Sequence, residues 1–133
     1  MLDHLSFAVI DYDKSLAFYD ATLAILGYQR EITLDFPGVK AAGYGDGGLR
    51  PGLWISAGGQ PNEAIGKAQG VHIAFKAPNV AAVQQWYQKC LDLGGKDNGE
   101  PGPRPHYHEG YYGAFIIDPN GWRIEACYHQ YRA

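Results

Sequence analysis

The sequence has few cysteines, few charged residues and no long apolar run. Its two cysteines, Cys90 and Cys127, lie among apolar neighbours, so we expect reduced core residues, although a bond between them stays open. A formal net charge of −3 without runs of either sign excludes the basic surface that nucleic acids or anionic membranes require. Because there is no basic, apolar leader and no apolar run of membrane length, we expect a soluble cytoplasmic protein.

What the chain does contain is an internal repeat. A shift of 68 residues, from position 4 to position 72, places His4-Leu5-Ser6-Phe7 on His72-Ile73-Ala74-Phe75 without a gap. Glycines and aromatic residues further along stay in register. With 133 residues and 46% hydrophobic residues, the chain suits one domain over residues 1–133. We expect module 1 at 1–57, a linker at 58–70 and module 2 at 71–133.

Each copy is predicted to begin with a strand and an amphipathic helix. Asp11 or Asp13 can cap the first helix, which ends at Gly27, and Asn79 can cap the second, which stops at Gly94-Gly95. The expected buried faces are Leu16, Tyr19, Leu23 and Leu26 in the first helix, and Val80, Val83, Tyr87 and Leu91 in the second. Strand-like pieces at 28–34, 39–44 and 53–57 complete the first copy, so the unit is βαβββ.

The second copy ends in a predicted hairpin. Residues 96–110 are polar and proline-containing and are expected to form a loop. Two strands, at 111–118 and 122–128, then flank Asp118-Pro119-Asn120-Gly121. Proline suits a type I turn, and asparagine and glycine suit its left-handed exit.

Glu125 is the unusual residue of this hairpin. Alternation along the last strand sends Ile124 to one face and Arg123 and Glu125 to the other. The carboxylate has apolar neighbours in the sequence, and a buried charge needs a compensating partner such as a metal ion.

The ends of the two copies can also be aligned. Residues 52–57 then match 121–126, and Ser56 takes the place of Glu125. Pseudo-twofold pairing of the copies would bring four side chains to one centre, namely His4, Ser56, His72 and Glu125. Taken singly, each histidine is an ordinary sheet residue. Together, His4, His72 and Glu125 are predicted to ligate a metal ion.

These features resemble the vicinal oxygen chelate superfamily, which includes glyoxalase I, bleomycin resistance proteins, fosfomycin resistance enzymes and extradiol dioxygenases. The resemblance rests on the double βαβββ pattern, on His4, on the strand at 70–75 and on the Asp-Pro-Asn-Gly-x-x-Ile-Glu motif at 118–125. It implies an α+β fold in which the two modules form a cupped eight-stranded mixed sheet. It also implies one divalent ion per site (Fe, Mn, Ni or Zn) and a homodimer.

One position departs from glyoxalase I, which carries a second glutamate where this chain has Ser56. Two imidazoles and one carboxylate leave positions that two adjacent substrate oxygens can fill, as in the extradiol dioxygenases and fosfomycin enzymes. We interpret Ser56 as a hydrogen-bonding pocket residue and Trp54 as pocket wall, or else as ordinary core.

The tract 104–112 contains His106 and His108, one residue apart and flanked by tyrosines. It is open to three interpretations: a second metal pair, an exposed tyrosine-rich loop, or a loop over the site. We favour the third, with His106, His108 or Tyr111 touching substrate as hydrogen-bonding or acid/base groups. Tyr111 and Phe115 share a strand face, which by the same resemblance looks inward.

Three classes of function remain open. The first is a metal-dependent enzyme (lyase, isomerase or dioxygenase) acting on a small, oxygen-rich substrate. The second is a non-catalytic protein of the bleomycin-resistance type that sequesters a small molecule in an aromatic groove. The third is a structural or regulatory dimer with a vestigial site.

Overall fold

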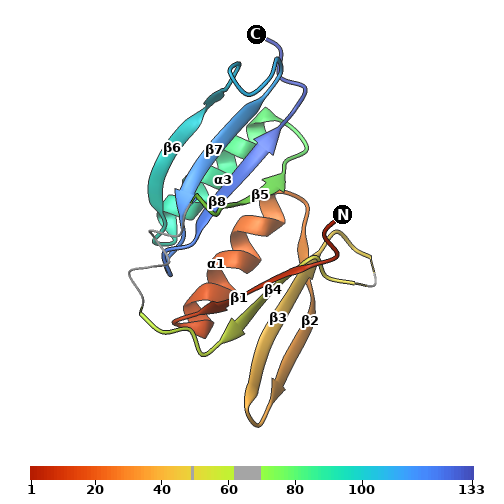
Figure 1. The fold of residues 1–133 in the computed structure, drawn as a ribbon, viewed down its shortest axis with the longest axis vertical. Coiled ribbons are helices and arrows are strands. Elements are labelled where there is room, and N and C mark those ends of the chain that lie inside the picture. The colour runs from red at the N-terminus through yellow and green to blue at the C-terminus, as the bar shows by residue number, and fades with distance from the viewer. Residues whose placement is uncertain (49, 62–69) are drawn as a thin grey trace. The chain divides into compact units, whose positions relative to one another are not determined.

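The chain folds as two units that share one topology, and its structure is a computed structural model that describes residues 1–48, 50–61 and 70–133 (Figure 1). The units are Met1–Pro61 and Asn62–Ala133. The division falls within the segment 58–70 that the sequence predicts as a linker, and residues 62–69 of that segment lie outside the described residues.

The first unit has the order strand, helix and three strands. Its elements are β1 (Leu5–Val9), α1 (Tyr12–Ile25), β2 (Gln29–Phe36), β3 (Val39–Gly45) and β4 (Leu53–Ala57). The strands lie in the order β1-β4-β3-β2, with β1 parallel to β4 and the remaining pairs antiparallel.

The second unit repeats this plan. Its elements are β5 (Ile73–Lys76), α3 (Val80–Asp92), β6 (Lys96–Pro103), β7 (Tyr112–Ile117) and β8 (Arg123–Tyr128). Their sheet order is β5-β8-β7-β6, and only β5 and β8 are parallel. The prediction of an α+β fold built from two βαβββ modules with mixed sheets is confirmed. None of the helices in the described part of the chain is long and apolar enough to cross a membrane.

The helices α1 and α3 begin at the predicted caps. Asp11 accepts a hydrogen bond from the Lys14 backbone, and Asn79 accepts one of 2.8 Å from the Ala82 backbone. Gly27 follows α1 with a φ of +93°, a left-handed conformation that glycine adopts without strain.

The buried faces of the helices match the prediction only in part. Tyr19 and Leu23 of α1 and its C-cap residue Leu26 are buried as predicted, while Leu16 is half-buried. In α3 the prediction was right at Val83 but wrong at Val80, Tyr87 and Leu91, which are half-buried. The buried face of α3 consists of Ala82, Val83, Trp86 and Cys90, because the large indole of Trp86 packs inward and turns the helix.

The loop predicted at 96–110 was wrong in its first half, because residues 96–103 form β6. This strand lies at the edge of its sheet and pairs only with β7. A proline lacks the N–H that a central strand needs, but an edge strand tolerates it. The pairing is also irregular near Gly99, whose φ is +150°.

The turn between β7 and β8 is as predicted in outline. The Gly121 N–H donates to the Asp118 carbonyl (3.0 Å), and the Asp118 N–H donates to the Trp122 carbonyl (2.8 Å). The Asp118 carboxylate also accepts from the backbone N–H groups of Asn120 (2.9 Å) and Trp122 (2.7 Å). Only Gly121, with φ of +103°, is left-handed; Asn120 is not.

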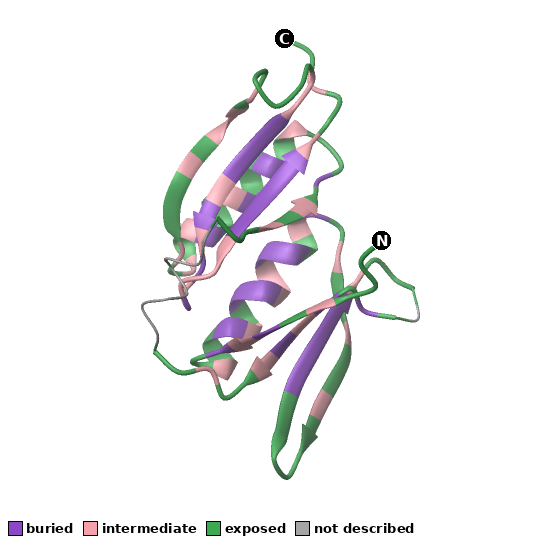
Figure 2. Cartoon of the chain, in the orientation of Figure 1, coloured by how far each residue is buried: buried purple, intermediate pink, exposed green. Residues whose placement is uncertain are grey.

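The core of each unit lies between its helix and one face of its sheet, as the buried segments in Figure 2 show. In the second unit Trp86 from α3 and Ile116 and Ile124 from the sheet are essentially inaccessible. Cys90 and Cys127 are both buried, as expected, and the structure has no disulfide between them.

The turn generates a prediction about stability. Asp118 is 3% exposed, so Asp118→Ala leaves buried backbone N–H groups without an acceptor and should lower the free energy of unfolding by roughly 2–4 kcal/mol. Asp46, an exposed aspartate between β3 and β4, is the control, and Asp46→Ala should change stability by less than about 0.5 kcal/mol. Urea titration of both variants measures the difference. Equal midpoints would show that the Asp118 contacts do not stabilise the turn.

Candidate functional site

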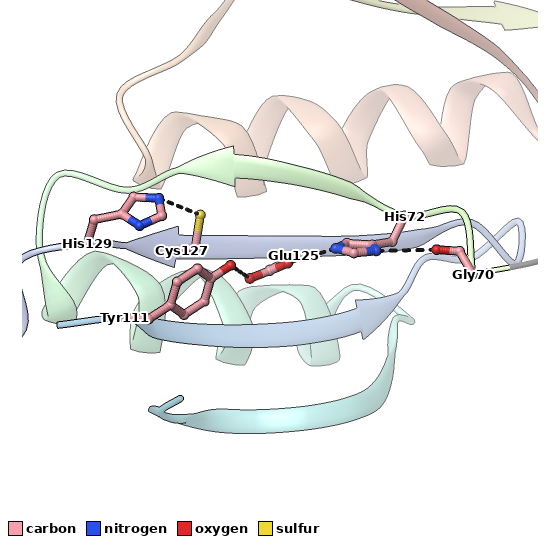
Figure 3. Close-up of polar contacts among 6 residues, drawn as sticks. All are labelled: Gly70, His72, Tyr111, Glu125, Cys127 and His129. Carbon is pink, nitrogen blue, oxygen red and sulfur yellow. Dashed lines mark hydrogen bonds and ion pairs between the residues drawn. The ribbon is translucent and has the colours of Figure 1, made fainter. Parts of the chain in front are cut away.

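Polar side chains gather on the face of the second sheet that points away from α3. Ile124 and Ala126 of β8 belong to the buried core, so alternation directs Glu125 and Cys127 to the opposite face. On β7, Phe115 lies opposite Glu125 and Gly113 lies opposite Cys127. The same face therefore receives residues from β7, from β8 and from the segments that flank the sheet (Figure 3).

Glu125 and His72 form the centre of this group. The Nε2 atom of His72 lies 3.0 Å from Oε2 of Glu125, although 53 positions separate the two residues in the sequence. The Glu125 side chain is 2% exposed and the His72 side chain 45% exposed. A buried carboxylate thus meets an imidazole that is still accessible from outside. The Phe115 ring lies edge-on to the imidazole, with centroids 6.2 Å apart.

The second oxygen of Glu125 has a different partner. The Tyr111 hydroxyl donates a hydrogen bond to Oε1, so Glu125 stands between Tyr111 and His72 (Figure 3). Burial, and next the hydrogen bond to Glu125, raise the pKa of the Tyr111 phenol above its ordinary value. The phenol is therefore a donor to the carboxylate throughout the neutral pH range.

The other ring nitrogen of His72 is turned toward the backbone. Nδ1 lies 3.5 Å from the Gly70 carbonyl oxygen, the direction in which an Nδ1–H group points. With the proton on Nδ1, Nε2 presents its lone pair toward Oε2 of Glu125, and the two atoms can share a cation; with the proton on Nε2, the imidazole donates a hydrogen bond to Oε2 instead. Metal-binding histidines commonly have this arrangement, with the non-ligating N–H donating to a carbonyl.

The group continues along β8 beyond Glu125. Cys127 Sγ lies 3.7 Å from Nε2 of His129, and Nδ1 of His129 lies 2.9 Å from Nε2 of His108. Burial is the main cause that raises the pKa of the Cys127 thiol. Since His129 uses its two nitrogens in different directions, these three residues do not converge on one point.

The tract 104–112 folds into turns, so His106 and His108 do not project from one side of an extended segment. Tyr107 N–H donates to the Arg104 carbonyl, and Tyr111 N–H donates to the His108 carbonyl. His108 contacts the Tyr111 ring, with centroids 5.3 Å apart, and stacks on His129. His106 packs against Tyr107 instead, at 4.5 Å. Both histidines are exposed, and His108 is the one in contact with a partner of Glu125.

The remaining predicted residues belong to the first unit. His4 directly precedes β1, as His72 directly precedes β5. Its side chain is 55% exposed, and its Nδ1 lies 2.6 Å from the Asp3 carboxylate. Trp54 and Ser56 are half-buried residues of β4, on one face of that strand.

Strand register changes the correspondence between the two units. Ser6 of β1 pairs with Trp54, whereas Ala74 of β5, 68 positions later (6 and 74), pairs with Glu125. Trp54 therefore occupies the place of Glu125, and the alignment that put Ser56 there was wrong by two residues. A two-residue shift keeps the same strand face, so the first unit still has no carboxylate at this position.

Two participants in this face were missed in the sequence: Cys127 and His129. Period-two alternation from Glu125 points to both, since Cys127 follows on the same face of β8 and His129 continues the alternation just past the end of the strand. Within the described ranges there is no cluster of three or more His, Cys, Asp or Glu side chains that could hold a metal ion.

Comparison with known proteins places this geometry in a family. The model of the Glyoxalase/Bleomycin resistance protein/Dioxygenase superfamily matches residues 1–126. No curated protein matches the chain.

Solved structures share the fold. A glyoxalase/bleomycin resistance protein from Albidiferax ferrireducens T118 is 25% identical, with 93% of this chain and 95% of that chain covered and a TM-score of 0.74. A glyoxylase/bleomycin resistance protein/dioxygenase domain from Frankia sp. EAN1pec is 16% identical, with 98% of each chain covered and a TM-score of 0.69. A glyoxalase I variant from Zea mays is 22% identical, with 93% of this chain but 44% of that one covered and a TM-score of 0.66.

The two βαβββ units, the turn that leads into Glu125 and the match over residues 1–126 agree with one another, and the chain belongs to the glyoxalase/bleomycin resistance protein/dioxygenase superfamily.

Proposed function

We propose that the protein is a metal-dependent enzyme that acts on a small, oxygen-rich substrate. His72 and Glu125 provide two protein ligands to one divalent ion, and His4, at the repeat position equivalent to His72, provides the third. The observation that carries the proposal is the pairing of a 2% exposed carboxylate with an accessible imidazole at 3.0 Å. The accessible imidazole leaves a path by which an ion and a substrate can reach the buried carboxylate.

The two donor atoms fit a divalent ion. Ligand atoms about 2.1 Å from one ion subtend roughly a right angle when they are 3.0 Å apart, which suits both tetrahedral and octahedral sites within ordinary scatter. Nitrogen and oxygen donors of this kind accept Fe, Mn, Ni or Zn. Both donors also have supporting contacts, because Tyr111 binds the other carboxylate oxygen and Gly70 lies beside the other imidazole nitrogen.

The chemistry follows from how few protein ligands there are. A bound ion would leave positions for two adjacent substrate oxygens and would stabilise negative charge on them. The chain's own residues bind and orient the substrate, and Phe115, beside His72, forms an apolar wall. Trp54 and Ser56 of β4 are proposed as the pocket residues of the first unit. The reaction class, whether lyase, isomerase or dioxygenase, depends on the substrate.

A proton acceptor or donor must come from outside the ligand set, because Glu125 is committed to the ion. We assign this role to His108 in preference to His106, since the His108 ring contacts Tyr111, which in turn donates to Glu125. An imidazole changes its charge near neutral pH, as such a role requires.

One observation favours an alternative function, sequestration of a flat ligand without catalysis. Aromatic rings follow one another from His106 through Tyr107 to Tyr111, and Tyr107 is 54% exposed. Such a surface can stack an aromatic molecule. Metal content separates the two functions, because sequestration by aromatic stacking requires no ion.

The first test is metal binding. The wild-type protein should bind one divalent ion per chain, and Glu125→Gln and His72→Ala should weaken the affinity by more than the 10–100-fold that is typical of outer contacts. The matched control is Glu100→Gln, at an exposed carboxylate on β6, which should bind as tightly as wild type. Isothermal titration with Mn²⁺ and Zn²⁺ gives the dissociation constants. Equal constants for wild type and Glu125→Gln would refute the site.

The second test concerns the reaction. Glyoxalase I has a second glutamate beside its metal, and here the equivalent position is Trp54, so turnover of the methylglyoxal–glutathione hemithioacetal should be weak or absent. Activity on a metal-chelating substrate should instead fall about 10²–10⁴-fold in His108→Ala. Hemithioacetal turnover on the order of 10 per second or more, unaffected by His106→Ala and His108→Ala, would contradict this assignment.

The third test is the oligomeric state, which we propose to be a homodimer. β2 is an edge strand, and Ile32, Phe36 and Val39 on the β2–β3 hairpin are exposed large hydrophobic residues. A twofold partner that covers such an edge gives a closed assembly. Sedimentation equilibrium at micromolar concentration should give twice the mass of the chain, and Phe36→Lys should lower it. A monomer mass for the wild type would overturn the proposal.

A further inference from the structure

Tyr111 contacts the proposed metal ligand Glu125, but no role has been assigned to that contact. The two carboxylate oxygens have separate partners: Oε1 accepts from the Tyr111 hydroxyl, and Oε2 faces Nε2 of His72 at 3.0 Å. A free carboxylate rotates and can offer either oxygen or both to an ion. This one is held so that only Oε2 is offered on the His72 side.

Gly113 makes the contact possible. A Cβ atom built at Gly113 would lie 3.1 Å from Oε1 of Glu125 and 3.1 Å from Cε1 of Tyr111. The backbone of Gly113 does not have a positive φ, so its conformation does not require glycine. The space around Gly113 does require glycine, because the Tyr111 phenol reaches the Glu125 carboxylate through the gap that the absent side chain leaves.

The ring of Tyr111 is itself fixed by its neighbours. It meets Tyr107, His108 and His129 edge-on, with centroid distances of 5.0, 5.3 and 5.1 Å. The backbone on both sides is also tied, because the Tyr111 carbonyl accepts from Arg104 N–H and its own N–H donates to the His108 carbonyl. Together, these contacts hold the Tyr111 phenol of the tract 104–112 in place.

We infer that Tyr111 is a positioning residue that reserves Oε1 of Glu125 and leaves Oε2 as the single metal-binding oxygen, with Gly113 providing the space. This rests on the proposed metal site. Its consequence is a carboxylate bound through one oxygen, which keeps a coordination position open for substrate. A carboxylate that chelates through both oxygens would fill that position.

Removal of the hydroxyl tests the inference. In Tyr111→Phe the affinity for Zn²⁺ should fall about 10–100-fold, the usual cost of losing an outer contact to a ligand, with one ion still bound per chain. Gly113→Ala should have the same effect, and the double variant should be no worse than either single one, because both changes act on one contact. The control is Tyr112→Phe: Tyr112 is the adjacent, buried tyrosine, and its hydroxyl accepts from Gln84 at 3.0 Å instead.

A spectroscopic measurement separates positioning from general loosening of the fold. The Co²⁺-loaded Tyr111→Phe protein should show weaker visible d–d absorption than wild type, because Glu125 then binds through both oxygens and the coordination number rises. Tyr112→Phe should keep the wild-type spectrum. An unchanged Zn²⁺ affinity and Co²⁺ spectrum in Tyr111→Phe would overturn the inference while leaving the metal site intact.

Metal-free protein provides the remaining distinction. Urea midpoints of Tyr111→Phe, Glu125→Gln and the double variant should be non-additive if the hydroxyl and the carboxylate interact. A wild-type protein that binds no ion would overturn both the proposed function and the positioning role. Additive midpoints together with wild-type affinity in Tyr111→Phe would overturn the positioning role alone.

Discussion

A single desolvated carboxylate determines how the second unit is built. Glu125 is 1% exposed as a residue, and an ionised group so buried is stable only where other groups replace the water it has lost. The surrounding elements each contribute to that replacement: the tract before β7 brings Tyr111, and the segment before β5 brings His72. Gly113 leaves room for the Tyr111 phenol. The burial of Glu125 therefore accounts for features in several parts of the chain.

The position of Glu125 is fixed by the turn that precedes its strand. Asp118 closes that turn with both its backbone and its carboxylate, and this sets the pairing of β7 with β8. A slip of one residue in that pairing would send Glu125 into the core against α3 and Ile124 to the outer face. The buried aspartate of the turn and the buried glutamate of the strand are therefore linked: the first sets the register that the second requires.

Much of this could be predicted from the sequence, because the signals are local. The repeat, the caps at Asp11 and Asn79 and the turn at 118–121 each depend on residues close together in the chain. What failed depended on contacts between distant segments. Strand register sets all three of the features that failed. They are the edge position that lets residues 96–103 form β6, the pairing of Ser6 with Trp54, and the contact between Tyr111 and Glu125. The site residues His4, His72 and Glu125 remain a prediction as a set, and the structure brings the last two together.

The difference between Glu125 and its repeat counterpart Trp54 bears on the kind of substrate. Under the proposed function, a divalent ion with one carboxylate and two neutral imidazoles has a net charge of about +1, from +2 for the ion and −1 for Glu125. A second glutamate at the Trp54 position would cancel that charge. With an indole at that repeat position, the proposed site would keep this unbalanced positive charge. Such a charge would favour a substrate whose chelating oxygens ionise over one that stays neutral.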